Sequence, residues 1–177
     1  PKFQKSIKHK KSWIGKNKII KIERWYFIMK VKDCMCDDVC CAKPETTVSD
    51  VAKLMSKNHV GSIPICDDNN CLCGIVTDRD ILLRTVACNK NASTTPISEI
   101  MTCDVCSCTG DDEVTNAESK MCQEQIRRLP VCDTNNHVIG ILTIGDLCHN
   151  DKELGAQQVN QTIKNICECK PNEKNAE

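Results

Sequence analysis

The chain has 177 residues, in which 24 Lys and Arg side chains balance 24 Asp and Glu, and it contains 16 cysteines. This length predicts one compact domain or two small ones, and the composition excludes a filament, a membrane-spanning bundle and a collagen-like repeat. The zero net charge averages two unlike parts: residues 1–28 hold nine of the basic side chains and one of the acidic ones, which leaves −8 on the rest.

Residues 1–28 form a separate segment, because they hold all five aromatic side chains of the chain. Three interpretations stay open: a basic arm for nucleic acid, a targeting peptide, or upstream DNA read as protein with the true start at Met29. The apolar stretch at residues 25–29 is shorter than the roughly 7–15 residues of a secretory core. Glu23-Arg24-Trp25 can be encoded by a purine-rich stretch that resembles a bacterial ribosome-binding site. We therefore expect residues 1–28 to be disordered or not native coding sequence.

Beyond this leader, the sequence repeats itself without a gap at a spacing of 66 residues. Matched positions include Met35 and Met101, Pro64 and Pro130, Gly74 and Gly140, Thr77 and Thr143, and Asp80 and Asp146. Two long copies are a tandem pair, not a solenoid. We expect a first domain at residues 29–90, a polar linker, a second domain at 95–150, and a C-terminal helix (151–166) with a polar tail in 151–177.

Each copy predicts the order strand, helix, strand, strand, helix. In the first copy, a short strand lies at residues 38–42. The helix that follows begins at Thr47, where a Thr-x-x-acid pattern precedes apolar residues at helical spacing, and it ends at Asn58. Its counterpart in the second copy has Glu118 in the place of Ala52, so we expect that helix to be less regularly amphipathic.

A hairpin follows in each copy. In the first, residues 62–66 form an apolar strand whose Pro64 favours an edge or terminal strand position, residues 67–70 form a turn, and residues 71–76 return as the second strand. A second helix begins at Thr77. Because a unit of about 60 residues buries too little surface to be stable alone, we expect the two copies to pack face to face in a pseudo-two-fold α/β sandwich.

Two heptads at the same offset, Gly74–Asp80 and Gly140–Asp146, both fit the pattern Gly-apolar-apolar-Thr-x-x-Asp. Together with His59–Pro64 and Gln125–Pro130, they resemble a tandem pair of cystathionine-β-synthase (CBS) domains, or Bateman module. The resemblance implies an α/β (α+β) fold of two β-α-β-β-α repeats packed as one module. It also implies homodimerisation and the binding of an adenosine derivative between the copies, such as AMP, ADP or ATP, or S-adenosylmethionine or NAD.

The resemblance also implies roles for individual residues. Asp80 and Asp146 would accept hydrogen bonds from ribose hydroxyls, and Thr77 and Thr143 would donate to phosphate at a helix start. Backbone groups around two prolines would contact the adenine, in the segments Ile63, Pro64, Ile65 and Leu129, Pro130, Val131. A carboxylate and a helix N-terminus suit these tasks chemically. The alternative is that each Thr-x-x-Asp is only a capping box that serves its own helix.

The two sites are not expected to be equal. Asp78-Arg79 in the first copy corresponds to Ile144-Gly145 in the second, and Arg127-Arg128 corresponds to Gly61-Ser62. We expect phosphates to meet Arg127 or Arg128 together with Arg79, because a guanidinium matches phosphate oxygens and a domain of charge −8 otherwise repels a nucleotide. The alternative is that these arginines are solvated surface charges.

The cysteines admit two interpretations. They could be reduced thiols at small apolar positions of a cytoplasmic protein, or they could make the chain a thiol-based metal or redox sensor on the same scaffold. The candidate metal ligands are Cys34, Cys36, Cys40, Cys103, Cys106 and Cys108. Their spacing is irregular, which is a weak metal signal.

The four histidines show no paired base or nucleophile, and no Gly-rich phosphate loop is present in the sequence. An enzyme is therefore disfavoured. The sequence predicts a non-enzymatic regulatory module that responds to an adenine nucleotide and acts on an unidentified protein. We do not expect it to bind a membrane or a nucleic acid.

Overall fold

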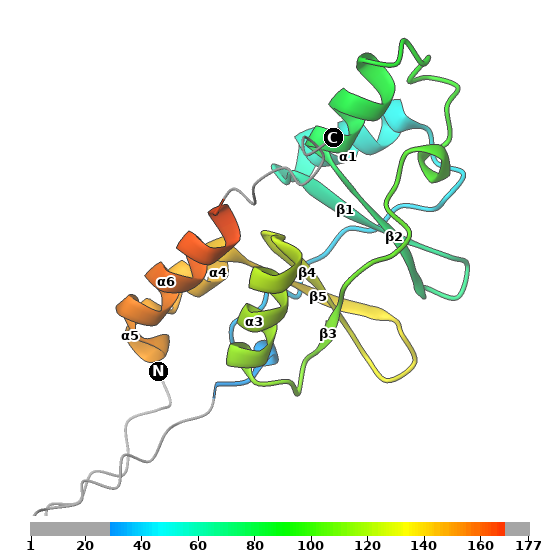
Figure 1. Ribbon diagram of the computed structural model, residues 1–177. Helices are drawn as coiled ribbons and strands as arrows, with labels where there is room; N and C mark the ends of the chain where they lie inside the picture. Colours follow the sequence, from blue (N-terminus) through cyan, green and yellow to red (C-terminus); the bar gives the residue numbers. More distant parts are fainter. Residues whose placement is uncertain (1–28, 169–177) are drawn as a thin grey trace, which may run out of the picture.

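The computed structural model describes residues 29–168, so the interpretations of residues 1–28 lie outside the described part. The chain forms two similar halves (Figure 1). The helices and strands in chain order are α1 (Val48–Asn58), β1 (Ser62–Cys66), β2 (Leu72–Thr77), α2 (Asp78–Ile81), β3 (Cys108–Thr109), α3 (Val114–Glu124), β4 (Arg128–Cys132), β5 (Val138–Thr143), α4 (Ile144–His149), α5 (Asp151–Leu154) and α6 (Ala156–Cys167). Short 3-10 turns lie at Val31–Asp33 and Ile97–Glu99, and a π-helical turn at Leu82–Val86.

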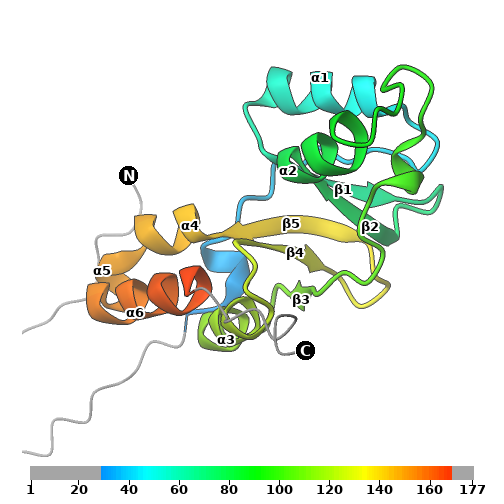
Figure 2. The same cartoon turned by 45° about the horizontal axis from the view of Figure 1, so that its top comes forward.

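The two halves repeat one sheet pattern. β1 and β2 are antiparallel, with Ser62 opposite Thr77, and β4 and β5 repeat this register with Arg128 opposite Thr143. β3 adds a short parallel strand beside β4. The two sheets lie between α1 and α2 on one side and α3 and α6 on the other (Figure 2). The predicted α+β fold of two repeats is confirmed.

Local signals place the first helix correctly. The Thr47 hydroxyl accepts a hydrogen bond from the Asp50 amide at 3.2 Å, so α1 begins where the capping pattern predicts. The helix ends at Asn58, and His59 follows in the left-handed conformation with φ of 55°. None of the helices within residues 29–168 combines the length and apolar character that crossing a bilayer requires.

The strand predicted at residues 38–42 is wrong in extent. Only Ala42 pairs, in a single parallel bridge to Ile65. The reason is that the segment crosses between the halves: Cys36 forms a bridge with Ile141 in the second half, and six residues later the chain reaches β1 in the first. The residues between these two bridges pass from one half to the other, so they cannot pair along a single strand.

Proline lies closer to a sheet edge in the first copy than in the second. Pro64 lies in β1, which pairs along its length with β2 and on its other side only through the single bridge between Ile65 and Ala42. Pro130 lies in β4, the middle strand of its sheet, so the edge prediction is wrong there. The parallel ladder with β3 involves only Val131 and Cys132, so the N–H that Pro130 lacks is not needed.

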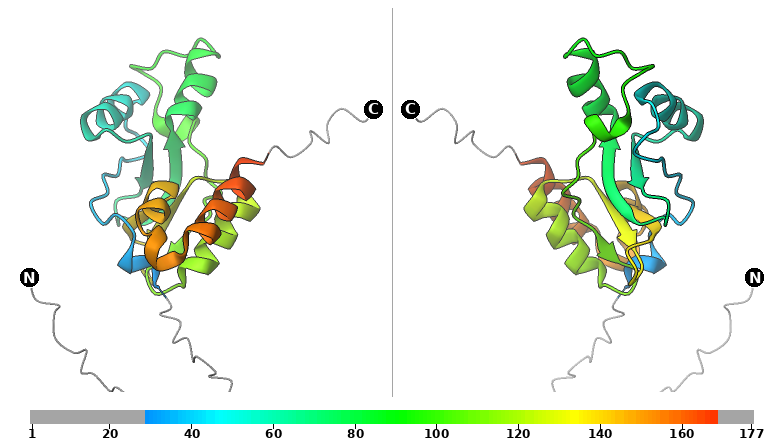
Figure 3. Two further views of the ribbon diagram at one scale, coloured as in Figure 1. Left: turned by 90° about the vertical axis from the view of Figure 1, so that its left-hand side faces the viewer. Right: turned by 90° about the vertical axis from the view of Figure 1, so that its right-hand side faces the viewer.

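The helix predicted over residues 151–166 is two helices, because Gly155 takes φ of 93° between α5 and α6. Glycine adopts this conformation at little cost. α6 then packs along α3 (Figure 3). The buried Glu118 of α3 accepts hydrogen bonds from Gln158 Nε2 (2.6 Å) and Thr162 Oγ1 (3.2 Å) of α6. The polar residue that interrupts the apolar face of α3 is therefore a partner for α6.

Each hydrophobic core includes a segment from outside its own half. Residues around Val31 and Cys34, at the start of the first copy, pack in the core of the second half. Ile97 and Ile100, at the start of the second copy, pack in the core of the first half. Sequence reasoning did not anticipate this exchange. Because neither core is complete without the other copy's leading segment, the two halves form one module.

Candidate functional site

A cavity of about 740 Å³ lies between the two halves. On one side its lining comes from the segment at residues 36–40 and from residues 58–62 with Pro64. On the other side it comes from Arg127 and Arg128, from residues between Ile141 and Asp146, and from α6. This volume is within the range of about 300–1,000 Å³ that is typical of small-molecule sites.

The start of α4 combines a helix cap with a free acceptor. Asp146 Oδ2 accepts hydrogen bonds from the Thr143 backbone N–H (2.8 Å) and from Thr143 Oγ1 (2.7 Å), and the Asp146 amide donates to Thr143 Oγ1 (3.2 Å). The capping-box alternative is therefore realised. Asp146 Oδ1 has no hydrogen-bond or ion-pair partner within residues 29–168, and Asp146 lines the cavity. One carboxylate can thus cap α4 and still accept from a ligand.

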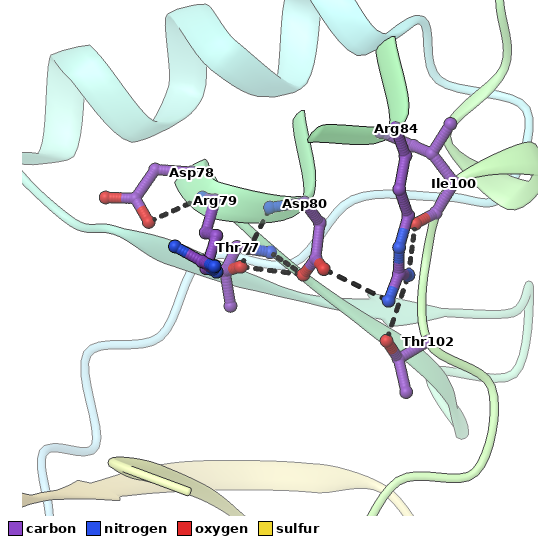
Figure 4. A network of polar contacts seen from close by, with 7 residues as sticks. All are labelled: Thr77, Asp78, Arg79, Asp80, Arg84, Ile100 and Thr102. Carbon is purple, nitrogen blue, oxygen red and sulfur yellow. Dashed lines mark hydrogen bonds and ion pairs between the residues drawn. The ribbon is translucent and has the colours of Figure 1, made fainter. Parts of the chain in front are cut away.

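The start of α2 has the same cap but no free acceptor. Asp80 Oδ2 accepts from the Thr77 backbone N–H (2.9 Å) and from Thr77 Oγ1 (2.7 Å). Asp80 Oδ1 forms an ion pair with Arg84 Nη2 at 3.2 Å (Figure 4). Thr77, Arg79 and Asp80 are not among the residues that line the cavity. Of the two duplicated motifs, the structure therefore brings only the second to an open site.

Both threonine hydroxyls are already engaged. A hydroxyl has one proton to donate, and here Thr77 and Thr143 donate it to the aspartate three residues later. The donation to phosphate that the family motif implies therefore requires the hydroxyl to leave its carboxylate.

Arg127 and Arg128 both line the cavity, and neither forms an ion pair within the described part of the chain. Gly61 makes room for Arg128, because a Cβ at residue 61 would lie 2.9 Å from Arg128 Nη2. Arg79 lies outside the cavity lining. The structure thus brings two of the three predicted arginines to the site, with the Asp78 carboxylate near Arg128, since the same Cβ would lie 3.0 Å from Asp78 Oδ2.

The apolar residues around the two prolines occupy different places. Pro64 lines the cavity. The side chains of the flanking Ile63, Ile65, Leu129 and Val131 are fully buried in the two cores, and Pro130 is buried in β4. Sequence reasoning did not assign Val60, which lines the cavity with 40% of its surface exposed. Its position inside the quoted segment His59–Pro64 was the signal that could have found it.

The six candidate cysteine ligands do not form a metal centre. Within residues 29–168, no group of three His, Cys, Asp or Glu side chains is placed to hold a metal ion. Burial raises the pKa of Cys34 to about 11 and that of Cys108 to about 12, which keeps both thiols protonated at neutral pH. Burial also raises the pKa values of Cys40 and Cys106.

The sequence of the chain is similar to that of a known protein family. The chain matches the family model described as CBS domain at residues 31–86 and again at 97–153. The CBS domain-containing protein YhcV of Bacillus subtilis is 38% identical over 139 residues, which cover 77% of this chain and 97% of YhcV.

Two solved structures are similar to this one. The first is the CBS domain pair of protein MJ0100 in complex with 5′-methylthioadenosine and S-adenosyl-L-methionine (31% identity, TM-score 0.64, covering 73% of this chain and 98% of that one). The second is CBSX2 in complex with AMP (27% identity, TM-score 0.62, covering 71% and 97%). No relative or structure named here has the name of an enzyme.

Proposed function

Because the chain belongs to the CBS domain family, we propose that it is a non-enzymatic regulatory module that binds an adenosine derivative of the AMP, ADP or ATP class in the cavity at the start of α4. The observation that supports this most directly is the free Oδ1 of Asp146 at a cavity between the halves. The related MJ0100 pair and CBSX2 both bind adenosine compounds, which supports the ligand class.

The cavity residues suit the parts of a nucleotide. Asp146 Oδ1 accepts hydrogen bonds from ribose hydroxyls, since an ionised carboxylate is an acceptor-only group. Arg127 and Arg128 pair with phosphate oxygens, which a planar guanidinium can contact through two N–H groups. Val60 provides an apolar surface for the adenine, and backbone groups near Pro64 offer hydrogen bonds to its polar edge. S-adenosylmethionine and NAD share the adenosine part and remain within this class.

Ligand binding would act on the arrangement of the halves. The cavity is lined from both of them, so a ligand that contacts both favours the arrangement in which they are close. Such a ligand shifts the populations of two states, and the coupling free energy is typically about 1–3 kcal/mol. An unidentified protein partner would read this change.

Calorimetric titration with AMP, ATP and S-adenosylmethionine tests the proposal, using Asp146→Asn and the matched control Asp80→Asn. Asparagine keeps one oxygen for the cap but places an N–H₂ group where the cavity has an acceptor. Loss of a charged hydrogen bond costs about 1.5–3 kcal/mol, so we expect Asp146→Asn to weaken AMP binding roughly 10-fold to 150-fold. Asp80→Asn should leave it unchanged. Absence of binding by all three compounds contradicts the proposal.

We also propose that two copies of this chain associate, in the cytoplasm. The π-helical turn exposes three large apolar side chains, Leu82 (56%), Leu83 (46%) and Val86 (62%), and apolar side chains that gather on the surface of a folded domain mark an interaction site. Analytical ultracentrifugation should show a dimer for the natural chain and a monomer for Leu82→Lys with Val86→Lys. A natural chain that sediments as a monomer contradicts this proposal.

A thiol-based redox sensor is the second candidate function, favoured by the contact between Cys41 and Cys66. The hydrogen bond between these thiols lowers the pKa of Cys41 and raises that of Cys66. With oxidised glutathione, the pair would form one S–S bond, and the two electrons and two protons lost would yield two glutathione thiols. Mass spectrometry of the treated protein should find the Cys41–Cys66 linkage, and its absence contradicts this candidate.

This oxidation would also affect the cavity. Because Ala42 pairs with Ile65, Cys41 and Cys66 lie diagonally across the two segments, a placement that separates Cα atoms by about 7–8 Å. A disulfide needs a shorter separation. Its formation would therefore pull on the adjoining residues 36–40, which line the cavity.

A further inference from the structure

Arg84 connects three acceptors at the start of α2 (Figure 4). Its Nη2 pairs with Asp80 Oδ1 at 3.2 Å. Its Nη1 donates to the Ile100 carbonyl oxygen at 2.7 Å and to Thr102 Oγ1 at 3.1 Å. Arg84 lies in the π-helical turn Leu82–Val86. Such turns inside helices are rare and frequently occur at functional sites.

The internal repeat shows what this guanidinium occupies. Asp80 corresponds to Asp146 and Thr102 corresponds to Cys36, at the 66-residue offset. Asp146 and Cys36 both line the cavity. The backbone pairing at these positions repeats as well, since Thr102 forms a bridge with Ile75 and Cys36 forms the matching bridge with Ile141. The open cavity at Asp146 in the second half therefore has a matching position at Asp80 in the first half, and the Arg84 side chain lies across that position.

The residue that corresponds to Arg84 in the second half is Asn150. Its side chain is too short to repeat the contact: Asn150 Nδ2 donates to the backbone carbonyl of Asp146 at 2.8 Å. It makes no contact with the Asp146 carboxylate among the described hydrogen bonds. The difference between an occupied and an open carboxylate thus follows from one substitution between the copies.

We propose that Arg84 is a built-in occupant of the first-half site, so that the chain binds one nucleotide, in the second half only. This proposal rests on the proposed function. It adds the number of nucleotides bound per chain and the residue that determines that number. A ribose in the first half would have to replace Arg84 at Asp80 Oδ1 and leave the Ile100 carbonyl and the Thr102 hydroxyl without their donor. The Asp80 side chain is only 18% exposed, so water compensates for little of that loss.

Reciprocal exchange of the two residues tests the proposal, with AMP as the probe in calorimetry of the full chain. The natural chain should bind one AMP per chain. Arg84→Asn should bind two, and adding Asp80→Ala to Arg84→Asn should return the value to one. Asn150→Arg should weaken the single site of the natural chain at least tenfold, because the new guanidinium can pair with Asp146 Oδ1.

Three results overturn the inference while leaving the proposed function in place: two AMP per natural chain, one AMP per chain for Arg84→Asn, or weaker AMP binding by Arg84→Asn. The last result would mean that Arg84 holds the phosphate and does not exclude it. No binding of AMP, ATP or S-adenosylmethionine by the natural chain and the variant overturns both proposals. Arg84→Gln, which keeps more of the side-chain length, replaces Arg84→Asn if circular dichroism shows that the latter is unfolded.

Discussion

Two matched glycines allow a direct test of how the leading segments are held. A Cβ on Gly140 would lie 2.5 Å from Met35 Sδ and 3.0 Å from the carbonyl oxygen of Cys36. A Cβ on Gly74 would lie 2.4 Å from Met101 Sδ, and its nearest neighbours all belong to that methionine side chain. Both substitutions by alanine therefore crowd a methionine, but only Gly140→Ala also crowds a backbone atom.

The difference between the two neighbours determines the expected cost. A methionine side chain is flexible and can move aside. The Cys36 carbonyl cannot, because it accepts from the Ile141 amide at 2.9 Å in a bridge that also has the reverse hydrogen bond at 3.0 Å. Overpacking typically costs about 1–3 kcal/mol. We assign this cost to Gly140→Ala and less than about 1 kcal/mol to Gly74→Ala, on the same scale.

Differential scanning calorimetry and urea unfolding measure both variants. For a chain of this size, 1 kcal/mol lowers the Tm by about 2–4 °C, so Gly140→Ala should melt roughly 2–12 °C lower and Gly74→Ala less than about 4 °C lower. In a double-mutant cycle, Met101→Ala should remove most of the Gly74→Ala cost. Met35→Ala should leave part of the Gly140→Ala cost in place. Equal costs for the two glycines, or no cost for Gly140→Ala, would refute the packing described here.

Three further predictions concern side chains away from the cavity. Glu118→Ala leaves the buried Thr162 hydroxyl and the Gln158 side chain of α6 without their acceptor and should lower the free energy of unfolding by about 1–3 kcal/mol; an unchanged urea midpoint argues against this contact. Cys66→Ala removes the hydrogen bond that lowers the pKa of Cys41, so alkylation of Cys41 at pH 8 should slow, and an unchanged rate contradicts the pairing. A hydrogen bond from the Thr109 backbone N–H lowers the pKa of Asp112. The ionised Asp112 therefore stabilises the fold fully above its ordinary pKa of about 3.9, and this stabilisation is lost as the pH falls further. Asp112→Asn should weaken the dependence of the free energy of unfolding on acid pH.

The local parts of the fold could be predicted because local chemistry determines them. The cap at Thr47, the end of the helix at Asn58 and the turns of both hairpins depend on residues close in sequence. The 66-residue repeat then predicted the second copy from the first. The extent of the strand at residues 38–42 could not be predicted in this way, because it depends on where the chain crosses between the halves.

The duplicated motif predicts candidate sites at both helix starts, but it does not predict that only Asp146 lines the cavity between the halves. The duplicated motif indicated both helix starts, and the structure confirms that each aspartate also caps its own helix. The difference lies outside the motif, at Arg84 and Asn150, four residues beyond the aspartates. That difference is visible in the aligned repeat, but its consequence depends on where the guanidinium reaches, which only the three-dimensional arrangement shows.

A crystal structure of the chain grown with AMP would show where the nucleotide binds. We expect one nucleotide per chain, with a ribose hydroxyl within hydrogen-bond distance of Asp146 Oδ1 and phosphate oxygens facing Arg127 and Arg128, while Arg84 stays paired with Asp80. A nucleotide bound at Asp80, or density for AMP anywhere but the cavity between the halves, would contradict it.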